Sequence, residues 1–396
     1  MSEWKKVKLK ELIKEVNERN KDEKVKTVLS VTNSRGFVSQ EEYFEGTVHS
    51  ANISNYKIVR KNQFAYNPSR VNVGSIDILK DYEYGVLSPM YVVFEVDITK
   101  LLPDYFKYYF QTNRFFENVK NNTQGSVRNS LSFRALADFD YLLPPIAEQE
   151  KIVKILRDAD SIIEKYGLLL EEKKQFIKSQ FIEMFGNPIN NSKKIKTEEM
   201  TNICEIIDGY RGSNYPKSGE FYEKEYCLFL NAKNVTNNGF SFANCMFITE
   251  KKDKLLGKGK LQRGDIVLTT RGTVGNIAFY TDDVPFDNMR INSGMVILRM
   301  NKEKINEVFF IEQFKLQLDK IKNKVASGSA QPQLPISKMK NIKILIPPIE
   351  DQNKYANFIK QIDKQKSLLE QQKKNYENLK KGLMQKLLTG KVKVNV

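Results

Sequence analysis

Two loops with matching residues could bind nucleic acid. Residues 67–74 and 269–275 each follow an apolar stretch, and each places an arginine four positions before a glycine. An arginine bridges phosphates or reads guanine through two hydrogen bonds, while hydroxyl and amide side chains position the duplex. The alternative is that the glycine serves a tight turn and the arginine a surface ion pair. The predicted DNA contacts in these loops are Asn67, Ser69, Arg70, Arg271 and Thr273.

Three further loops could contribute to the same surfaces. Residues 125–130 and 328–333 occupy matched places but differ in sequence, and different side chains on a shared framework favour different targets. Residues 208–215 combine glycine, arginine and tyrosine, although they could equally form an ordinary strand connection. The predicted DNA contacts here are Arg128, Asn129, Arg211, Ser213, Tyr215, Gln331 and Gln333.

The chain lacks residues that several catalytic mechanisms require. Its single histidine, His49, excludes histidine-dependent nucleases and two-histidine metal sites. No G-x-x-x-x-G-K-[ST] sequence occurs, which excludes a P-loop motor. The segments 67–69 and 187–189 are the nearest matches to the Asn-Pro-Pro-aromatic loop of a base methyltransferase, and both are read as turns. We therefore predict neither a catalytic site nor a metal site.

The charge balance favours a polyanionic partner. The chain carries 64 basic and 48 acidic residues, a net charge of +16, which attracts phosphates and releases their counterions on binding. Cys204, Cys227 and Cys245 have no C-x-x-C spacing and are expected to be reduced residues of the core. No apolar run is long enough to span a bilayer. These features predict a cytoplasmic protein that binds nucleic acid and no membrane.

An internal repeat in the sequence predicts how the domains and helices that carry these loops are arranged along the chain. Leu143-Pro144-Pro145-Ile146, followed by Glu148-Gln149, returns 203 residues later as Ile346-Pro347-Pro348-Ile349, followed by Asp351-Gln352. A period this long indicates two whole domains, each followed by its own helix. The predicted boundaries are a first globular domain at 1–145, a helix at 146–188, a second globular domain at 189–348, and a helix with its tail at 349–396.

The two segments after the Pro-Pro pairs are predicted to be helices of about 40 residues, or roughly 60 Å. Apolar residues recur in each at a seven-residue step, and Gly186 and Gly390 are plausible ends. We expect the helices to pair with each other in an antiparallel coiled coil; the alternative is two unrelated amphipathic helices, each packed on its own domain. The predicted pairing residues are Leu156, Ile163, Leu170, Ile177, Met184, Tyr355, Ile362, Leu369, Tyr376 and Leu383.

The globular domains are predicted to mix strands and helices. Strands are expected at 91–96, 265–268 and 295–298, where β-branched and aromatic residues gather, and helices at 104–120 and 306–325, where apolar residues recur every three or four positions. The predicted fold class is α+β: two tandem-repeated mixed domains joined by two long paired helices, with pseudo-twofold symmetry.

Together these features resemble the specificity subunit of type I restriction-modification systems, over essentially the whole chain. The resemblance rests on the two Pro-Pro motifs with Glu148-Gln149 or Asp351-Gln352, on the long helix after each, and on the closing stretch 379–390. Asp351 stands where glutamate is more usual. The resemblance implies that each globular domain is a target-recognition domain that reads one half of a bipartite, asymmetric site in double-stranded DNA.

The resemblance also implies a non-catalytic subunit that binds no cofactor itself. Its partners would be two methyltransferase subunits, which use S-adenosylmethionine to methylate adenine at N6, and motor-nuclease subunits, which use ATP and Mg²⁺. A second apolar track on the helices would face the methyltransferase subunits, through Ile155, Ile162, Leu169, Phe176, Phe358 and Leu379.

Two other classes of function fit parts of the pattern. One is a stand-alone bipartite DNA-binding regulator or architectural protein, in which the helices only space the two domains. The other is a coiled-coil scaffold without a DNA role, against which the basic balance and the duplicated arginine-glycine loops argue.

Overall fold

A computed structural model describes residues 4–43, 50, 52–123, 130–326 and 333–394, and the side chains of 319 and 323–326 are not described. His49 and three of the predicted DNA contacts, Arg128, Asn129 and Gln331, lie outside the described residues. The chain forms two compact units. Unit 1 contains residues 1–167 and 371–396, and unit 2 contains residues 168–370.

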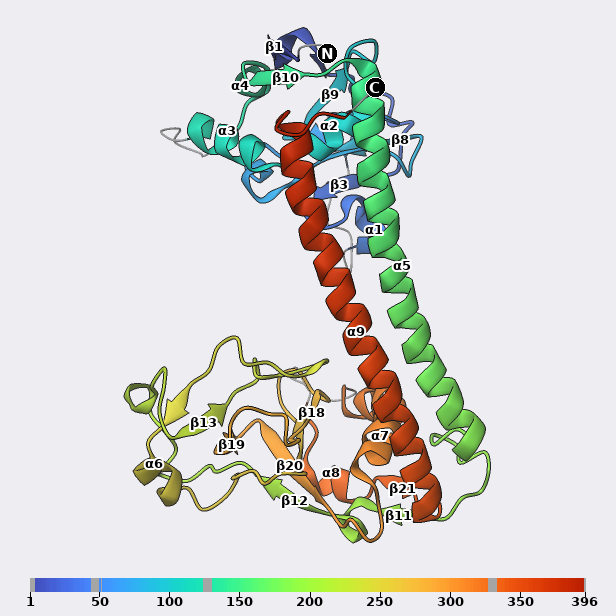
Figure 1. Cartoon of the computed structure of the whole chain (residues 1–396), viewed down its shortest axis with the longest axis vertical. Coiled ribbons are helices and arrows are strands. Elements are labelled where there is room, and N and C mark those ends of the chain that lie inside the picture. The colour runs from blue at the N-terminus through green and yellow to red at the C-terminus, as the bar shows by residue number, and fades with distance from the viewer. Residues whose placement is uncertain (1–3, 44–49, 51, 124–129, 327–332, 395–396) are drawn as a thin grey trace. The chain divides into compact units, whose positions relative to one another are not determined.

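Unit 1 holds a four-stranded sheet, smaller sheets and short helices (Figure 1). Its strands are β1 (Lys5–Lys8), β2 (Ile13–Val16), β3 (Leu29–Thr32), β4 (Gly36–Ser39), β5 (Lys57–Arg60), β6 (Phe64–Tyr66), β7 (Ile76–Ile78), β8 (Tyr84–Leu87), β9 (Val92–Val96) and β10 (Asp140–Leu143). Its short helices are α1 (Gln40–Tyr43), α2 (Pro103–Tyr109), α3 (Asn113–Thr123) and α4 (Phe133–Ala137).

Unit 2 is built in the same way. Its strands are β11 (Thr197–Glu199), β12 (Cys204–Asp208), β13 (Cys227–Leu230), β14 (Val235–Thr236), β15 (Gly239–Phe240), β16 (Phe247–Ile248), β17 (Ile266–Thr269), β18 (Ile277–Phe279), β19 (Met289–Ile291), β20 (Met295–Met300) and β21 (Lys343–Leu345). Its shorter helices are α6 (Glu250–Leu255), α7 (Glu307–Ala326) and α8 (Ile336–Lys340).

The sequence repeat is also a repeat of sheet topology. The strand order β2-β9-β6-β7 in unit 1 matches β12-β20-β17-β18 in unit 2, with antiparallel pairing throughout both sheets. Each unit adds a two-stranded antiparallel pair, β1 with β10 and β11 with β21. The strands expected at 91–96, 265–268 and 295–298 are confirmed as β9, β17 and β20.

Two helices of 40 residues, α5 (Ile146–Phe185) and α9 (Ile349–Leu388), confirm the helical prediction. Each begins directly after a Pro-Pro pair, because proline disfavours helix in the residue before it. The chain leaves them at the predicted glycines, Gly186 at φ +75° and Gly390 at φ +71°, a backbone conformation that glycine adopts without steric cost.

The glutamine of each Pro-Pro motif fixes the start of its helix. Gln149 is fully buried, donates hydrogen bonds to the carbonyls of Lys100 and Pro144, and accepts one from the Leu102 amide. The copy at Gln352 makes the same three bonds, to the carbonyls of Lys304 and Pro347 and from the Asn306 amide. One side chain therefore ties each long helix to the loop before α2 or α7.

Within unit 1, the first part of α5 packs against the last part of α9. Leu156 shares a core with Met384 and Leu387, and the rings of Tyr166 and Tyr376 are 5.6 Å apart. Residue numbers rise along α5 as they fall along α9, so these two segments are antiparallel. Asp160 fastens them further, since it accepts hydrogen bonds from Lys380 and from the Tyr108 hydroxyl of α2.

Within unit 2, the last part of α5 packs against the first part of α9 in the same antiparallel sense. The Tyr355 hydroxyl donates to the Ile177 carbonyl at 3.2 Å, and Ile177 and Ile362 share one core. The rings of Phe176 and Phe358 meet edge to face, with centroids 5.5 Å apart.

The single helix expected at 104–120 is wrong, because the structure has two helices there, α2 and α3. The chain turns after Phe110, and the Thr112 hydroxyl accepts a hydrogen bond from the Phe115 amide at the first turn of α3. A threonine that satisfies a free amide in this way favours a helix start over continuation. The helix expected at 306–325 is confirmed as α7.

The cysteines behave as residues of the core. Cys204 and Cys227 are buried and Cys245 is half-buried, and all three are free thiols. Burial raises the pKa of Cys204 and of Cys227 to about 12, so neither thiol ionises at neutral pH.

Candidate nucleic-acid interface

The first arginine-glycine loop connects β6 to β7 in unit 1. The Asn67 side chain accepts a hydrogen bond from the Ser69 amide, and the Arg70 carbonyl accepts one from the Ser75 amide at 3.2 Å. Gly74 at φ +93° completes the turn. The loop is thus folded by its own backbone and by Asn67, which leaves Ser69 and Arg70 exposed at its tip.

The second loop connects β17 to β18 in unit 2. Buried Thr269 organises it, because its hydroxyl donates to the Thr273 carbonyl and accepts from the Asn276 amide. Gly275 lies at φ +95°, and a Cβ there would come within 2.7 Å of the Leu318 side chain. The left-handed backbone of the turn favours glycine at this position, and the Leu318 side chain of α7 lies close beside it. Arg271 and Thr273 are exposed.

In each unit the loop before α4 or α8 meets the arginine-glycine loop. The Leu131 amide donates to the Pro68 carbonyl at 3.0 Å in unit 1, and the Leu334 amide donates to the Thr270 carbonyl at 2.9 Å in unit 2. Gln333 pairs with Arg271 as an isolated antiparallel bridge. The structure therefore brings together Arg271, Thr273 and Gln333, which are distant in sequence.

The loop at 208–215 belongs to the same face of unit 2. The Gly294 carbonyl accepts hydrogen bonds from the Thr270 and Arg271 amides, and the neighbouring Ser293 carbonyl accepts one from the Arg211 guanidinium at 3.2 Å. Gly209 packs so closely on Asn292 that a Cβ would lie 2.0 Å from its carbonyl oxygen. Residues 292–294 thus join two loops that lie far apart in the sequence, 208–215 and 269–275.

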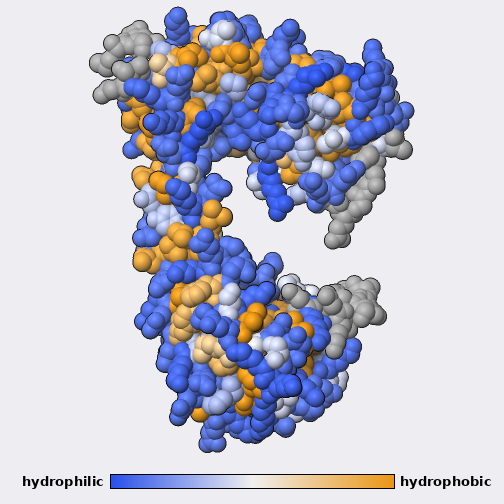
Figure 2. All heavy atoms as spheres, turned by 90° about the vertical axis from the view of Figure 1, so that its right-hand side faces the viewer, coloured by the Kyte–Doolittle hydropathy of each residue, from blue (hydrophilic) through white to orange (hydrophobic). Residues whose placement is uncertain are grey.

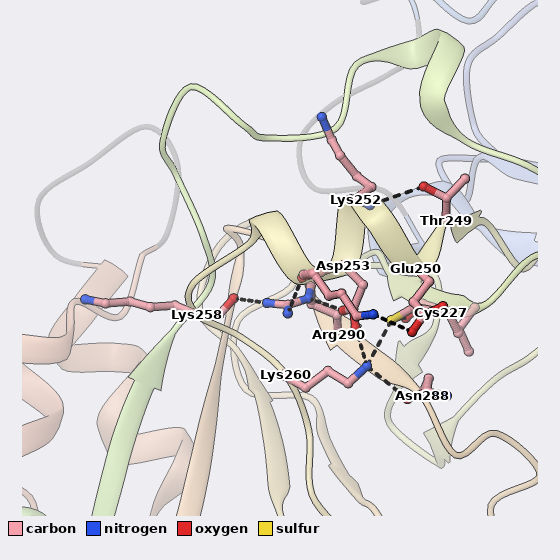
Figure 3. A network of polar contacts seen from close by, with 11 residues as sticks. Cys227, Thr249, Glu250, Lys252, Asp253, Lys258, Lys260, Asn288 and Arg290 are labelled. Atoms are coloured by element: carbon pink, nitrogen blue, oxygen red, sulfur yellow. Dashed lines mark hydrogen bonds and ion pairs between the residues drawn. The ribbon is translucent and has the colours of Figure 1, made fainter.

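A buried ionic network fixes the adjoining segment 257–260 (Figure 3). The Arg290 Nε donates to Asp253 Oδ1 at 2.8 Å, its Nη2 donates to the Asp253 carbonyl, and its Nη1 donates to the Lys258 carbonyl. Lys260 donates to Asp253 Oδ2 at 2.6 Å and to Asn288 at 3.0 Å. Burial would raise the pKa of Asp253, but the cations of Lys260 and Arg290 outweigh burial and hold that pKa below its ordinary value.

The network also positions a lysine that the sequence analysis missed. The Gly259 carbonyl accepts a hydrogen bond from the Ile291 amide, and Gly259 packs against Gly209 of the 208–215 loop. Lys258 is exposed, and in Figure 3 its side chain points away from the network. Neither Lys258 nor residues 292–294 carried a sequence signal, because only the fold brings Gly259 to Gly209 and residues 293–294 to Arg211 and Arg271.

Some of the predicted DNA-contact side chains are exposed and have no hydrogen bond or ion pair among the described residues, and others are held by neighbouring residues. Arg70 and Arg271 are exposed, and neither guanidinium has a hydrogen-bond or ion-pair partner among the described residues. Arg211 is held by Asp208 at 3.0 Å as well as by the Ser293 carbonyl. The Tyr215 ring packs edge to face on Phe229, so it supports its loop, while Ser213 is exposed.

The predicted pairing residues lie mostly between the long helices. Leu156, Ile177, Tyr355 and Ile362 are buried, whereas Met184 is 38% exposed at the end of α5. The remaining pairing residues are half-buried: Ile163, Leu170, Leu369, Tyr376 and Leu383.

The second apolar track is largely open to solvent. Its exposed members are Ile162, Leu169, Phe176 and Leu379, of which Leu379 is 63% exposed. Ile155 and Phe358 are half-buried and pack against the cores of unit 1 and unit 2. The Phe358 ring also contacts the Phe176 ring, so these two predicted partner contacts take part in pairing the helices as well. Figure 2 shows hydrophobic residues interrupting the hydrophilic surface of the molecule. Single exposed apolar residues are ordinary, but a track of them on one helix is typical of a protein-binding surface.

Within the described ranges, no cluster of three or more histidine, cysteine or acidic residues is arranged to hold a metal ion. None of the helices in the same ranges is long and apolar enough to cross a bilayer.

The comparisons with known proteins agree on one family. The family described as "Type I restriction modification DNA specificity domain" matches residues 1–173 and 192–377, one match for each half of the repeat. The MjaVIII specificity subunit of a type I restriction enzyme from Methanocaldococcus jannaschii is 27% identical over 357 residues, covering 85% of this chain and 80% of that protein. A protein from the same organism, provisionally named the MjaX specificity subunit, is 24% identical and covers 99% and 94%.

Two solved structures share the fold. One is a chain from work on complex assembly and conformational transition of a type I restriction-modification system, with a TM-score of 0.55, 13% identity and 99% of both chains covered. The other is the S subunit from M. genitalium, with a TM-score of 0.51, 16% identity, and 97% of this chain and 96% of that chain covered.

Proposed function

The chain belongs to the family of type I restriction-modification DNA specificity subunits, and from this premise we propose how it performs that role. It recognises a bipartite, asymmetric site in double-stranded DNA, with one half read by each unit. It performs no chemistry itself and serves as the scaffold for two methyltransferase subunits and for motor-nuclease subunits of the complex.

The observation that carries the DNA part of this proposal is the duplicated site. Both units place an exposed arginine, whose guanidinium has no partner among the described residues, on a loop between equivalent strands of the four-stranded sheet. A guanidinium that is already desolvated and paired would have to break that pair before it could bind DNA, and Arg70 and Arg271 avoid this cost. The net charge of +16 supplies the long-range attraction to phosphate.

The long helices support the bipartite part of the proposal. In each unit a segment of α5 pairs with a segment of α9 in the antiparallel sense. We propose that this pairing continues along both helices as the antiparallel coiled coil that the heptad pattern predicts. Such a spacer sets the distance between two DNA half-sites.

The exposed apolar track on α5 supports the proposal that the chain is a scaffold for other subunits. Leu169 and Phe176 lie two turns apart and are 42% and 43% exposed, which suits contact with a helix of a methyltransferase subunit. This open apolar surface favours a subunit over the alternative of a stand-alone regulator, which would have no partner to cover it. The methyltransferase would supply S-adenosylmethionine chemistry and the motor-nuclease ATP and Mg²⁺ chemistry, and the complex would act in the cytoplasm.

The proposal is tested by mapping methylated adenines across the genome in cells that carry the chain and in cells from which it is deleted. We expect one methylated sequence to disappear with the chain, made of two short specific parts separated by a spacer of fixed length. The matched control restores the chain from a plasmid. A continuous site, or a methylation pattern that does not change, contradicts the proposal.

A further inference from the structure

In unit 1 an aromatic side chain fills the junction where α5 begins and α9 ends. Trp4, the single tryptophan of the chain, donates its indole N–H to the Glu148 carboxylate in the first turn of α5. The ring also packs on the core that contains Leu387 and Leu388. A Cβ on Gly390 would lie only 3.3 Å from the ring, so the indole occupies the space against that glycine.

The repeat identifies the corresponding place in unit 2. Lys6 pairs with Leu142 in β1–β10, and Thr197 pairs with Leu345 in β11–β21. Lys6 therefore corresponds to Thr197, and two residues earlier Trp4 corresponds to Ile195.

The other parts of the junction also have counterparts. At the repeat distance of 203 residues, Glu148 corresponds to Asp351, and Leu387 and Leu388 correspond to Met184 and Phe185. In unit 1 the start of α5 and the end of α9 enclose the indole. The equivalent ends in unit 2 are the start of α9 and the end of α5, and Asp351 places a carboxylate where unit 1 has Glu148.

In unit 2 this junction is open. A hollow of about 550 Å³ lies there, and it is lined by Met184, Phe185, Ile195, Lys196, Ile346, Pro347, Pro348 and Asp351. Ile195 is half-buried and smaller than an indole, while Met184 is 38% exposed although it occupies a heptad position. The volume is within the range of about 300–1,000 Å³ that small-molecule sites span.

We propose that this hollow receives a tryptophan side chain from a partner polypeptide, whose indole N–H donates to the Asp351 carboxylate. Most of the lining residues are apolar side chains and proline rings, which suit a flat aromatic body, while Lys196 and Asp351 add charged groups. The Asp351 side chain is 44% exposed and forms one ion pair among the described residues, to Lys354 at 3.2 Å, so its carboxylate keeps further acceptor capacity. An indole combines both properties, and tryptophan is a common anchor of protein interfaces.

The repeat supplies the argument for an indole. In unit 1 the equivalent pair of helix ends encloses an indole, and the carboxylate at the equivalent position accepts its N–H. This inference concerns assembly with a protein and does not depend on which loops read DNA.

The first experiment asks whether the hollow accommodates an indole. The full chain carrying Ile195→Trp is labelled with 5-fluorotryptophan, and fluorine NMR is recorded in H₂O and in D₂O. We expect the resonance of the introduced residue to show a small solvent isotope shift, as a buried ring does, together with a raised melting temperature. The matched control is Ile189→Trp, at a surface position that is 41% exposed. Equal solvent shifts at positions 195 and 189 overturn the proposal.

The second experiment asks whether the hollow selects an indole from outside the chain. N-acetyl-L-tryptophanamide is titrated onto the unmodified full chain and followed by saturation-transfer NMR. We expect binding that is lost in the Ile195→Trp variant, and weakened roughly tenfold when the probe is methylated on the indole nitrogen, because a hydrogen bond to a charged acceptor is removed.

Two outcomes of the second experiment contradict the inference. One is equal binding of N-acetyl-L-leucinamide, which would make the hollow a general apolar surface. The other is undiminished binding of the tryptophan probe to the Ile195→Trp variant, which would place the probe elsewhere. The DNA affinity of this variant is expected to equal that of the unmodified chain, so failure here is distinct from failure of the proposed DNA-reading function.

Discussion

At the scale of single residues, Arg70 and Arg271 differ from other arginines in the contacts of their guanidinium groups. Two other arginines of unit 2 are already engaged, Arg211 with Asp208 and Arg290 with Asp253. Arg70 and Arg271 have no such partner in the part of the chain that the structure describes. The fold therefore assigns structural roles to some cations and leaves others for a ligand.

Replacing Arg271 by alanine is expected to weaken DNA binding. The loss should be roughly 1–3 kcal/mol if the guanidinium reads a base, and the salt dependence should fall by about one unit if it contacts a phosphate. Fluorescence anisotropy of the assembled complex on its own site, measured over a series of salt concentrations, separates the two. The control is Lys254→Ala, which removes a cation of unit 2 that is paired with Glu250. Affinity and salt slope unchanged from the unmodified protein would exclude both roles.

Replacing Asp253 by asparagine is expected to destabilise unit 2 by about 3–5 kcal/mol, because the cations of Arg290 and Lys260 lose their buried partner. The pKa of Asp253 is held low in the native state, so its stabilisation is complete above the ordinary aspartate value of about 3.9. It is lost as pH falls through the lower native pKa. Melting temperatures followed from neutral to acid pH should therefore converge for the two proteins, and a constant difference would refute this account.

At the scale of elements, each long helix depends on one buried glutamine. Gln149 and Gln352 satisfy equivalent backbone groups in the two units, which explains why a glutamine stands at the same place after each Pro-Pro pair. The prolines stop the preceding segment from becoming helical, and the glutamine fixes where the helix leaves the domain.

Replacing Gln352 by leucine keeps the side-chain size but leaves buried backbone groups of Lys304, Asn306 and Pro347 without a partner. Each such group costs roughly 1–3 kcal/mol, so we expect unit 2 to melt well below its normal temperature. Hydrogen exchange should show the loss of protection at the start of α9. Gln361→Leu is the matched control, because Gln361 is exposed on the same helix. Equal stability of the two variants would show that Gln352 has no such role.

The exposed track of α5 gives a second prediction for the elements. The double replacement Leu169→Asp and Phe176→Asp is expected to abolish co-purification of the methyltransferase subunit, since two charges would have to be buried in the contact. Both domains should remain folded by circular dichroism. Lys178→Asp is the control, because two residues rotate a side chain by about 200° around the helix, away from Phe176. A complex that survives the double replacement rules out this face.

At the scale of the whole molecule, the two halves share a framework and differ in detail. The four-stranded sheets and the glutamine contacts are repeated, whereas the Asp160–Lys380–Tyr108 contact of unit 1 has Asp363, Ile177 and Glu312 at the corresponding positions in unit 2. A duplicated framework with divergent contacts suits two recognition tasks and asymmetric assembly.

This organisation predicts that the two arginines affect different halves of one DNA site. Methylated adenines are mapped in cells that carry Arg70→Ala or Arg271→Ala. Because each unit is proposed to read its own half, we expect each variant to relax the base preference in one half only, and not the same half. Identical changes in both variants, or changes spread over both halves, would contradict independent reading.

Sequence periodicity was sufficient to predict those helices and strands whose apolar residues recur at regular intervals. Heptads defined α5 and α9, and alternating or continuous apolar runs defined β9, β17 and β20, because buried faces require apolar residues at fixed intervals. The same reasoning failed at 104–120, where Thr112 starts a new helix within an apolar pattern that itself does not break.

The sequence by itself determined the duplication, the two long helices, the strongly basic charge and the family of this protein, since these are properties of residue type and spacing. Only the tertiary structure decided that residues 208–215, 270–273, 292–294 and 333 of unit 2 share one face, and that a tryptophan fills one helix junction while the other is hollow. The physical reason is that such proximity depends on sheet order and backbone hydrogen bonds between distant segments, which leave no regular spacing in the chain.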